Sequence, residues 1–205
     1  MTFEDWSVGL AEVSSSPAPL SRPTAHRPTT DFPATARPTG RGSAYGDPEE
    51  NRMTRFHAKN SSAATLKSSR ADVWKALTDP ELLPELTPYL HRIDVNGDRW
   101  TWHVAKVPLL GKSIGTTFTE VMTFEEPHRI GFTHDEERAE EQSAVEGEYI
   151  LEDAGEGCRV SIEIGVSVEL PFAKVTRRAV EGGMRAVMAL MGRRFASNLL
   201  RHLGE

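Results

Sequence analysis

The sequence predicts an α+β domain in which a curved antiparallel sheet of about seven strands wraps around one long C-terminal helix. Residues 171–203 carry apolar side chains at helical spacing, and residues 90–168 alternate apolar and polar side chains with a period of two. Two short helical segments separate a first strand from this alternating region. A helix with a single apolar stripe needs an apolar surface to cover, and the strands supply it.

The composition is that of one domain with an extension. The chain has 205 residues, of which 38% are hydrophobic, and its formal net charge is −6. This charge argues against nucleic acid as a partner, because phosphate binding needs a basic face. Cys158 is the single cysteine, which excludes an internal disulfide.

The first residues carry no targeting or membrane signal. Glu4 and Asp5 stand where a secretory signal would carry Lys or Arg. No apolar run reaches the roughly 18 residues that a membrane span needs. We therefore expect a cytoplasmic protein without stable membrane insertion.

Residues 1–53 differ from the rest of the chain because they are rich in Pro, Ser, Thr and Arg and poor in large aliphatic residues. Such a segment cannot bury enough apolar surface to offset its ordering entropy. We predict a disordered tail over 1–53 and a folded domain over 54–205. The tail is either a tether or partner segment of polyproline character or a dispensable extension, with Met53 as the true first residue.

The folded part is predicted to open near Ser61 with a short strand, SAATLKSS. Ser69 and Asp72 form a capping box for the helix ADVWKALT. Asp79-Pro80 then starts a second short helix through ELLPEL, with Asp79 as N-cap and a break at Pro84.

After Tyr89 the period changes from helical to two. Asn96-Gly97 is a strong hairpin signal, and a second turn is predicted at residues 125–127. An acidic loop, DEERAEE, precedes a last hairpin across DAGEG. The predicted strands contain residues 93–95, 100–104, 116–124, 130–132, 145–151 and 160–168.

Over residues 58–203 the chain resembles the START-like (SRPBCC, Bet v 1-like) superfamily, in its polyketide cyclase/dehydrase and lipid transport branch. The resemblance rests on SSRADVWKALTDPELLPELTPYL after the first strand, EEPHRIGF at the middle hairpin and the amphipathic closing helix. It implies a helix-grip fold with a pocket for an apolar ligand, such as a lipid, polyketide or isoprenoid, between sheet and helix. No catalytic residue of the family matches a position in this chain, so the resemblance does not supply an activity.

One polar pair is predicted on the apolar face of the sheet. A register that sets Phe124 opposite Ile130 also sets Met122 opposite Phe132, and Glu120 opposite His134. A buried carboxyl beside an imidazole could transfer protons, which makes Glu120 and His134 candidate catalytic residues. The alternative is a solvated salt bridge at the end of the sheet.

Aromatic and sulfur-containing side chains on the sheet and closing helix are the candidate ligand contacts, and core packing is the alternative for each of them. Arg177 joins this set if the helix runs straight, because it could then anchor an acidic head group. Gly182-Gly183 could instead kink the helix or permit close packing. The candidate ligand-binding residues are Trp100, Trp102, Phe118, Met122, Phe132, Tyr149, Arg177, Met184, Met188 and Met191.

The sequence lacks the spacings of a HExxH site, a cysteine cluster, a phosphate-binding glycine loop or a nucleophile elbow. We therefore expect neither a metal nor a cofactor, and we interpret the other helix arginines, Arg193 among them, as a solvated face. Three functions remain: binding of an apolar small molecule, cyclase or dehydratase chemistry through Glu120 and His134, and a partner-regulated module that uses the tail. The oligomeric state is left open.

Overall fold

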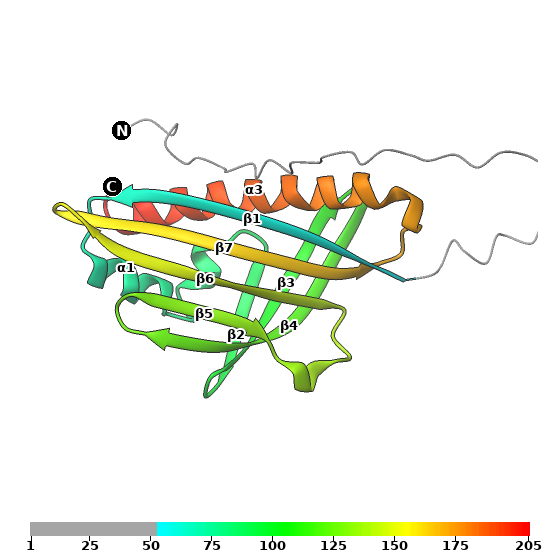
Figure 1. Ribbon diagram of the computed structural model, residues 1–205, viewed down its shortest axis with the longest axis horizontal. Coiled ribbons are helices and arrows are strands. Elements are labelled where there is room, and N and C mark those ends of the chain that lie inside the picture. Colours follow the sequence, from blue (N-terminus) through cyan, green and yellow to red (C-terminus); the bar gives the residue numbers. More distant parts are fainter. Residues whose placement is uncertain (1–52) are drawn as a thin grey trace, which may run out of the picture.

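The computed structural model describes residues 53–205, so the predicted tail lies outside the described residues except for Met53. Seven strands and one long helix dominate the fold (Figure 1). The elements are β1 (Thr54–Leu66), α1 (Arg70–Leu77), α2 (Leu83–Leu86), β2 (Leu90–Asn96), β3 (Arg99–Leu109), β4 (Lys112–Glu125), β5 (Arg129–His134), the 3-10 helix η2 (Glu136–Arg138), β6 (Ser143–Ala154), β7 (Gly157–Leu170), the 3-10 helix η3 (Lys174–Thr176) and α3 (Arg177–His202).

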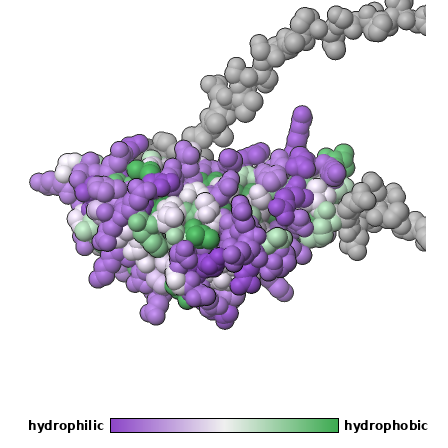
Figure 2. Space-filling model, turned by 60° about the horizontal axis from the view of Figure 1, so that its bottom comes forward, coloured by the Kyte–Doolittle hydropathy of each residue, from purple (hydrophilic) through white to green (hydrophobic). Residues whose placement is uncertain are grey.

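The strands form one antiparallel sheet in the order β1-β7-β6-β5-β4-β3-β2. The sheet curves, and α3 lies along it beside β1 (Figure 1). The predicted fold class, a helix-grip arrangement with two short helices after the first strand, is confirmed. Polar side chains cover most of the face shown in Figure 2, where apolar groups form only small patches.

β1 is longer than predicted. It begins at Thr54 rather than near Ser61 and pairs with β7 from Thr54 opposite Leu170 to Leu66 opposite Cys158. Phe56 and Ala58 in its first half are buried in the core. The prediction stopped short because polar residues at 59–62 interrupt the apolar alternation.

The predicted start of the first helix is confirmed and that of the second is wrong. Ser69 is the N-cap of α1: its Oγ accepts from the backbone N–H of Asp72 at 3.2 Å and donates to the Asp72 carboxylate at 2.6 Å. Asp79 instead caps a turn, in which its carboxylate accepts from the N–H groups of residues 81 and 82. α2 starts only at Leu83, and Pro84 lies in its first turn, where a missing N–H costs nothing, so it does not break the helix.

Two hairpins differ from prediction in their details. Asn96 pairs with Arg99, so the turn consists of Gly97 and Asp98, and Gly97 supplies the positive φ of 63°. β3 and β4 also extend beyond the predicted strands, to a turn at Leu110-Gly111 with φ values of 46° and 77°. Pro108, which usually marks a strand edge or end, obscured this extension.

The predicted pairing of β4 with β5 is confirmed, with Glu120 opposite His134, Met122 opposite Phe132 and Phe124 opposite Ile130. The predicted pairing of β6 with β7 is confirmed as well. Gly147 faces Phe132 across the sheet, and a Cβ at residue 147 would approach the Phe132 ring to 2.8 Å. The space that the missing side chain of Gly147 leaves is therefore filled by the Phe132 ring.

α3 is held at its two ends. Near its start, Val180 and Met184 pack in a core cluster with Phe56, Leu109 and Leu170. Near its end, Leu199 joins a second cluster that includes Leu77 and Leu83 of α1 and α2. Each such buried side chain contributes about 1.5–3 kcal/mol to folding.

Polar contacts reinforce the second end of α3. The Asn198 side-chain amide donates to the Leu86 carbonyl oxygen at 2.9 Å. The Glu205 carboxylate accepts from the backbone N–H groups of Lys67 and Ser68 at 3.0 and 2.9 Å. Between these two anchored ends, the middle of the helix contributes no buried side chain to either cluster.

The glycine pair in α3 permits close packing. The helix is continuous from Arg177 to His202 and starts later than the predicted Pro171, after η3. A Cβ at Gly183 would lie 3.0 Å from Leu109 Cδ1, whereas one at Gly182 would meet only the tip of Arg185 at 3.9 Å. The tip of the β3–β4 hairpin can therefore touch the helix because residue 183 has no side chain.

We expect Gly183→Val to unfold more readily than Gly182→Val, by about 1–3 kcal/mol in the free energy of unfolding. The two variants share the same helix propensity, so their difference isolates the contact with Leu109. Urea denaturation followed by circular dichroism measures it. Equal stabilities would show that the hairpin tip moves away from the helix at no cost.

Candidate functional site

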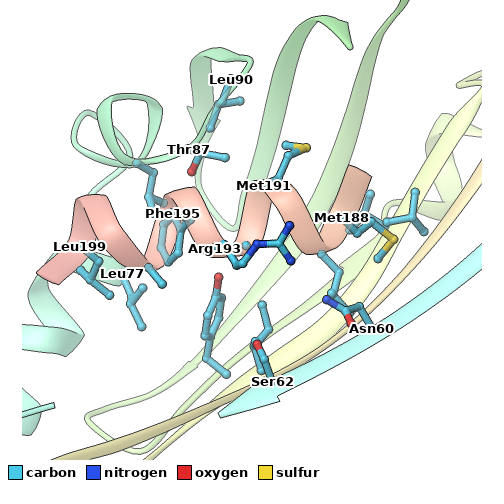
Figure 3. Close-up of a pocket in the computed structure, with 18 of the residues that line it drawn as sticks. Asn60, Ser62, Leu77, Thr87, Leu90, Met188, Met191, Arg193, Phe195 and Leu199 are labelled. Carbon is cyan, nitrogen blue, oxygen red and sulfur yellow. The ribbon is translucent and has the colours of Figure 1, made fainter. Parts of the chain in front are cut away.

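A cavity of about 1080 Å³ lies between the sheet and α3. Side chains from all seven strands and from α3 line it, with Leu90 contributed by β2, and Leu77 and Leu83 of the two short helices contribute at one end. Figure 3 shows α3 passing over the cavity with Met188, Met191 and Phe195 on it and Asn60 and Ser62 on β1. The unpacked middle of α3 is thus the part of the helix that faces the cavity.

The cavity floor consists of five buried side chains on two neighbouring strands. Alternate residues of a strand face the same side of a sheet, which brings three positions of β4 and two of β5 into the cavity. The floor residues are Phe118, Glu120, Met122, Ile130 and Phe132. Apart from one carboxyl group, this floor is apolar.

Aromatic rings form the walls beside the floor. Trp102 stacks on Phe118 with ring centroids 6.3 Å apart and an interplanar angle of 10°. Tyr149 lies against Phe132 with centroids 6.1 Å apart. Both Trp102 and Tyr149 line the cavity.

Glu120 carries the buried carboxyl group of the site. Its side chain is 3% exposed, and no other described residue forms a hydrogen bond of good geometry with it. Burial raises the pKa of its carboxyl well above the ordinary value of 4.5, and the nearby Trp102 indole lowers that pKa by less. Although close enough to exert this effect, Trp102 Nε1 is buried and lies outside hydrogen-bonding geometry with every described residue.

Tyr149 adds a hydroxyl group to the same region. Burial, together with the negative charge of Glu120 nearby, raises the pKa of the Tyr149 phenol. Tyr149 is partly buried, and its side chain lines the cavity. Glu120, Trp102 and Tyr149 are therefore side chains with polar groups in the lining of a largely apolar space.

His134 does not line the cavity, although its backbone pairs with that of Glu120. Its Nδ1 lies 3.9 Å from Glu141 Oε2 and has no hydrogen-bond partner in the described part of the chain. Glu141 in turn accepts from the Thr119 N–H and hydroxyl at 2.7 and 2.8 Å. The register thus brings the two candidate catalytic residues together along the backbone, whereas only Glu120 reaches the cavity.

The other predicted contacts divide into two groups. Eight of the predicted contacts line the cavity. They are Phe118, Met122 and Phe132 of the floor, Trp102 and Tyr149 of the walls, and Met184, Met188 and Met191 of the helix. Trp100 does not: it is buried against Trp102 and Phe124, with ring centroids 6.2 and 5.8 Å away. Arg177 also lies outside, because it pairs with Glu181 at 2.9 Å and covers the Phe56 ring.

The sequence analysis missed a set of polar lining residues. Asn60 and Ser62 lie in the part of β1 that was not recognised, and Thr116 and Ser143 join their hydroxyls at 2.6 Å. Arg193 was interpreted as solvated; it is exposed and also lines the cavity, with its side chain along α3 in Figure 3. The exposed charged lining residues, which we call the rim, are Lys67, Arg159, Arg193, Arg201 and Glu205.

Helical periodicity concealed Arg193, because it places this residue away from the stripe that contains Met191. A long, flexible side chain can cover apolar surface while its charged end stays in water. The interruption of the apolar alternation at Asn60 and Ser62 was a usable signal, since polar residues inside a paired strand call for an explanation.

Residues 53–205 contain neither a cluster of metal-ligating side chains nor a helix that could span a membrane. No group of three or more His, Cys, Asp or Glu side chains lies close enough together to hold a metal ion. None of the helices in this part of the chain has the length and apolar character required to span a membrane.

Comparisons with known proteins place this geometry in context. The family model described as polyketide cyclase / dehydrase and lipid transport matches residues 57–199. A search of curated proteins found no match. Similar solved structures include a conserved protein from Geobacillus kaustophilus, with 14% identity, a TM-score of 0.54, and coverage of 73% of this chain and 95% of that one.

Two other solved structures have a similar fold. A START superfamily protein from Mycobacterium smegmatis has 13% identity and a TM-score of 0.54, covering 71% of this chain and 97% of that one. The di-domain ARO/CYC StfQ from the steffimycin biosynthetic pathway has 11% identity and a TM-score of 0.51, covering 71% of this chain and 50% of that one. At these identities the similarity shows a shared fold.

Glu120 should make the protein less stable as the pH rises. Above pH 4.5 it ionises in the unfolded chain but stays protonated in the folded one, so unfolding releases a proton until the pH passes the raised folded-state pKa. Glu120→Gln removes this effect. The free energy of unfolding of Glu120→Gln, relative to that of the natural protein, should therefore increase with rising pH by up to about 1.4 kcal/mol per pH unit.

Urea denaturation at pH 5, 6, 7 and 8 measures this dependence. Glu156→Gln, which changes an exposed carboxyl in the β6–β7 turn, is the matched control. A difference between Glu120→Gln and the natural protein that stayed constant over this range would show that Glu120 ionises equally in both states.

Proposed function

The chain belongs to the polyketide cyclase/dehydrase and lipid transport family of the START-like (SRPBCC) superfamily, and from this we propose that it binds an apolar small molecule of lipid, polyketide or isoprenoid type. The proposed binding site is the cavity between the sheet and α3. Membership in this family supports a ligand-binding domain, and the chemistry of the cavity supports the apolar character of the ligand.

The observation that carries the proposal is the size and lining of the cavity. Pockets for small molecules usually measure about 300–1,000 Å³ and combine apolar walls with a few placed polar groups. The cavity of about 1080 Å³ has this composition. Leaving such an apolar surface facing water is unfavourable, and an apolar ligand would remove it from water.

The lining also suggests how a ligand is accommodated. The stacked rings of Trp102 and Phe118 offer a flat wall for a ring or chain. Met184, Met188 and Met191 line the opposite side on α3, where flexible side chains can adapt to the shape of the ligand. We propose these residues, together with Met122, Phe132 and Tyr149, as the ligand contacts.

Catalysis of the polyketide cyclase or dehydratase type is the second candidate function. The observation in its favour is Glu120, a buried carboxyl in the cavity whose pKa is raised well above that of an ordinary glutamate, so that it keeps its proton at a higher pH. In this candidate Glu120 and His134 form an acid/base pair, and Glu120 is the member that contacts a substrate in the cavity. Glu120→Gln should then abolish turnover and leave affinity nearly unchanged, while loss of both together would indicate a structural role.

The binding proposal predicts a co-purifying ligand. Native mass spectrometry of protein isolated from its own host should show a bound apolar compound, and its mass would identify the ligand class. An environment-sensitive dye such as anilinonaphthalene sulfonate should bind in the cavity and be displaced by that compound. If no compound is retained and no dye is displaced, the proposal is wrong.

Filling the cavity should abolish binding. Gly192 lines the cavity, and a Cβ added to it meets no atom within 4 Å, so Gly192→Phe adds a ring in open space. We expect it to weaken dye and ligand binding at least about tenfold, or about 1.4 kcal/mol. Gly182→Phe on the same helix, away from the cavity, is the matched control; equal affinities for both variants would place the ligand elsewhere.

A further inference from the structure

Trp102 lines the cavity and carries a hydrogen-bond donor that no described residue uses. Its Nε1 is buried and has no hydrogen-bond partner among residues 53–205. An indole N–H can only donate, so it requires an acceptor atom. Buried donors are rarely left unpaired in folded proteins, and this one therefore requires an explanation.

The carboxyl of Glu120 lies at the same place, close enough for the Trp102 indole to lower its pKa. Trp102 on β3 pairs with Phe118 on β4, and Glu120 is the next residue of β4 that faces the cavity. The two side chains are diagonal neighbours on one face of the sheet. A carboxyl that is 3% exposed favours its neutral form, which carries an O–H donor.

Apart from the carboxyl of Glu120 and the hydroxyl of Tyr149, the cavity floor beside Trp102 supplies no acceptor. The other floor residues, Phe118, Met122, Ile130 and Phe132, are apolar. The Tyr149 hydroxyl, also near Glu120, has no hydrogen bond with a described residue and lines the same cavity. A hydrocarbon ligand would cover these polar groups and leave their hydrogen bonds unmade.

The charge at the floor favours a neutral ligand group. Every cationic side chain that lines the cavity belongs to the exposed rim, so an anionic group at the floor would have no counter-charge in the described lining. An ammonium group could pair with Glu120 if it ionised but would oppose the N–H of Trp102. A carbonyl oxygen has two lone pairs and can accept from both donors.

We propose that the ligand carries a neutral carbonyl oxygen that accepts hydrogen bonds from Trp102 Nε1 and from the carboxyl group of Glu120. This inference rests on the proposed function, because it specifies the polar end of the apolar ligand. The carbonyl group lies at the floor, and the apolar body of the ligand extends toward the methionines of α3. Shape selects the body of the ligand, and the two donors select one oxygen on it.

The test compares two probes of nearly the same shape, fluorenone with a carbonyl group and fluorene without one. Their dissociation constants are measured by displacement of the cavity dye, and the preference is the ratio of the two constants. We expect the natural protein to bind fluorenone about tenfold more tightly. The carbonyl stretching band of bound fluorenone should also shift to lower frequency, as it does on hydrogen bonding.

Four variants locate the source of the preference. Trp102→Phe, which keeps a ring and removes the N–H, should reduce it at least about threefold, and Glu120→Leu should do the same. Glu120→Gln, whose amide still donates, should keep most of it. Trp100→Phe, a matched change next to the cavity but outside its lining, should retain the full preference.

The outcomes separate this inference from the proposed function. Equal binding of the two probes by the natural protein would overturn the carbonyl assignment and leave the binding proposal standing. Loss of preference in Glu120→Gln equal to that in Glu120→Leu would overturn the role of Glu120 as a neutral donor. Failure of both probes to displace the dye would overturn the proposed function and this inference together.

Discussion

The fold depends on how α3 is held against the sheet. Apolar clusters and hydrogen bonds fix the two ends of the helix, while its middle is separated from the sheet by the cavity. Protein interiors normally close onto such spaces, because empty volume forfeits packing contacts. In this fold the spacing is maintained by contacts at the ends, among them the close approach of the β3–β4 hairpin tip to Gly183.

Glu120 is the residue whose burial most clearly reduces the stability of the fold. A carboxyl on an apolar strand face loses its hydration, and no described residue compensates for it with an ion pair. Residues that reduce stability in this way concentrate at functional sites. Trp102 next to it follows the same pattern, since its N–H is buried without an acceptor. The two polar groups lie next to each other on an otherwise apolar part of the cavity lining.

The sequence was sufficient for the architecture because periodicity reports which face of an element is buried. The register that pairs Glu120 with His134 followed from the turn between β4 and β5, and the structure has it. The sequence-based predictions were wrong or incomplete where a side chain lines the cavity and does not pack in the core. Asn60 and Ser62 in β1 interrupt the apolar alternation. Arg193 lines the cavity although its position on the helix predicts a side chain in solvent.

The candidate site was less predictable because facing the same side of a sheet does not decide which residues reach a cavity. Trp100 and Trp102 alternate correctly, yet one is packed behind the wall and the other forms it. His134 sits opposite Glu120, but its ring lies beside Glu141 where β5 ends. These differences depend on how side chains pack around an unfilled space, and sequence spacing carries little information about that.

Anchoring α3 by its ends has an evolutionary consequence. Residues in the middle of the helix that face the cavity, such as Met188 and Met191, are only partly buried, so exchanging them removes less stability than exchanging the buried residues of the two clusters. Substitutions that reshape the cavity can therefore accumulate without unfolding the domain. This part of the cavity lining is separate from the residues that hold the fold together, which allows one scaffold to acquire new specificities through few, individually tolerable changes.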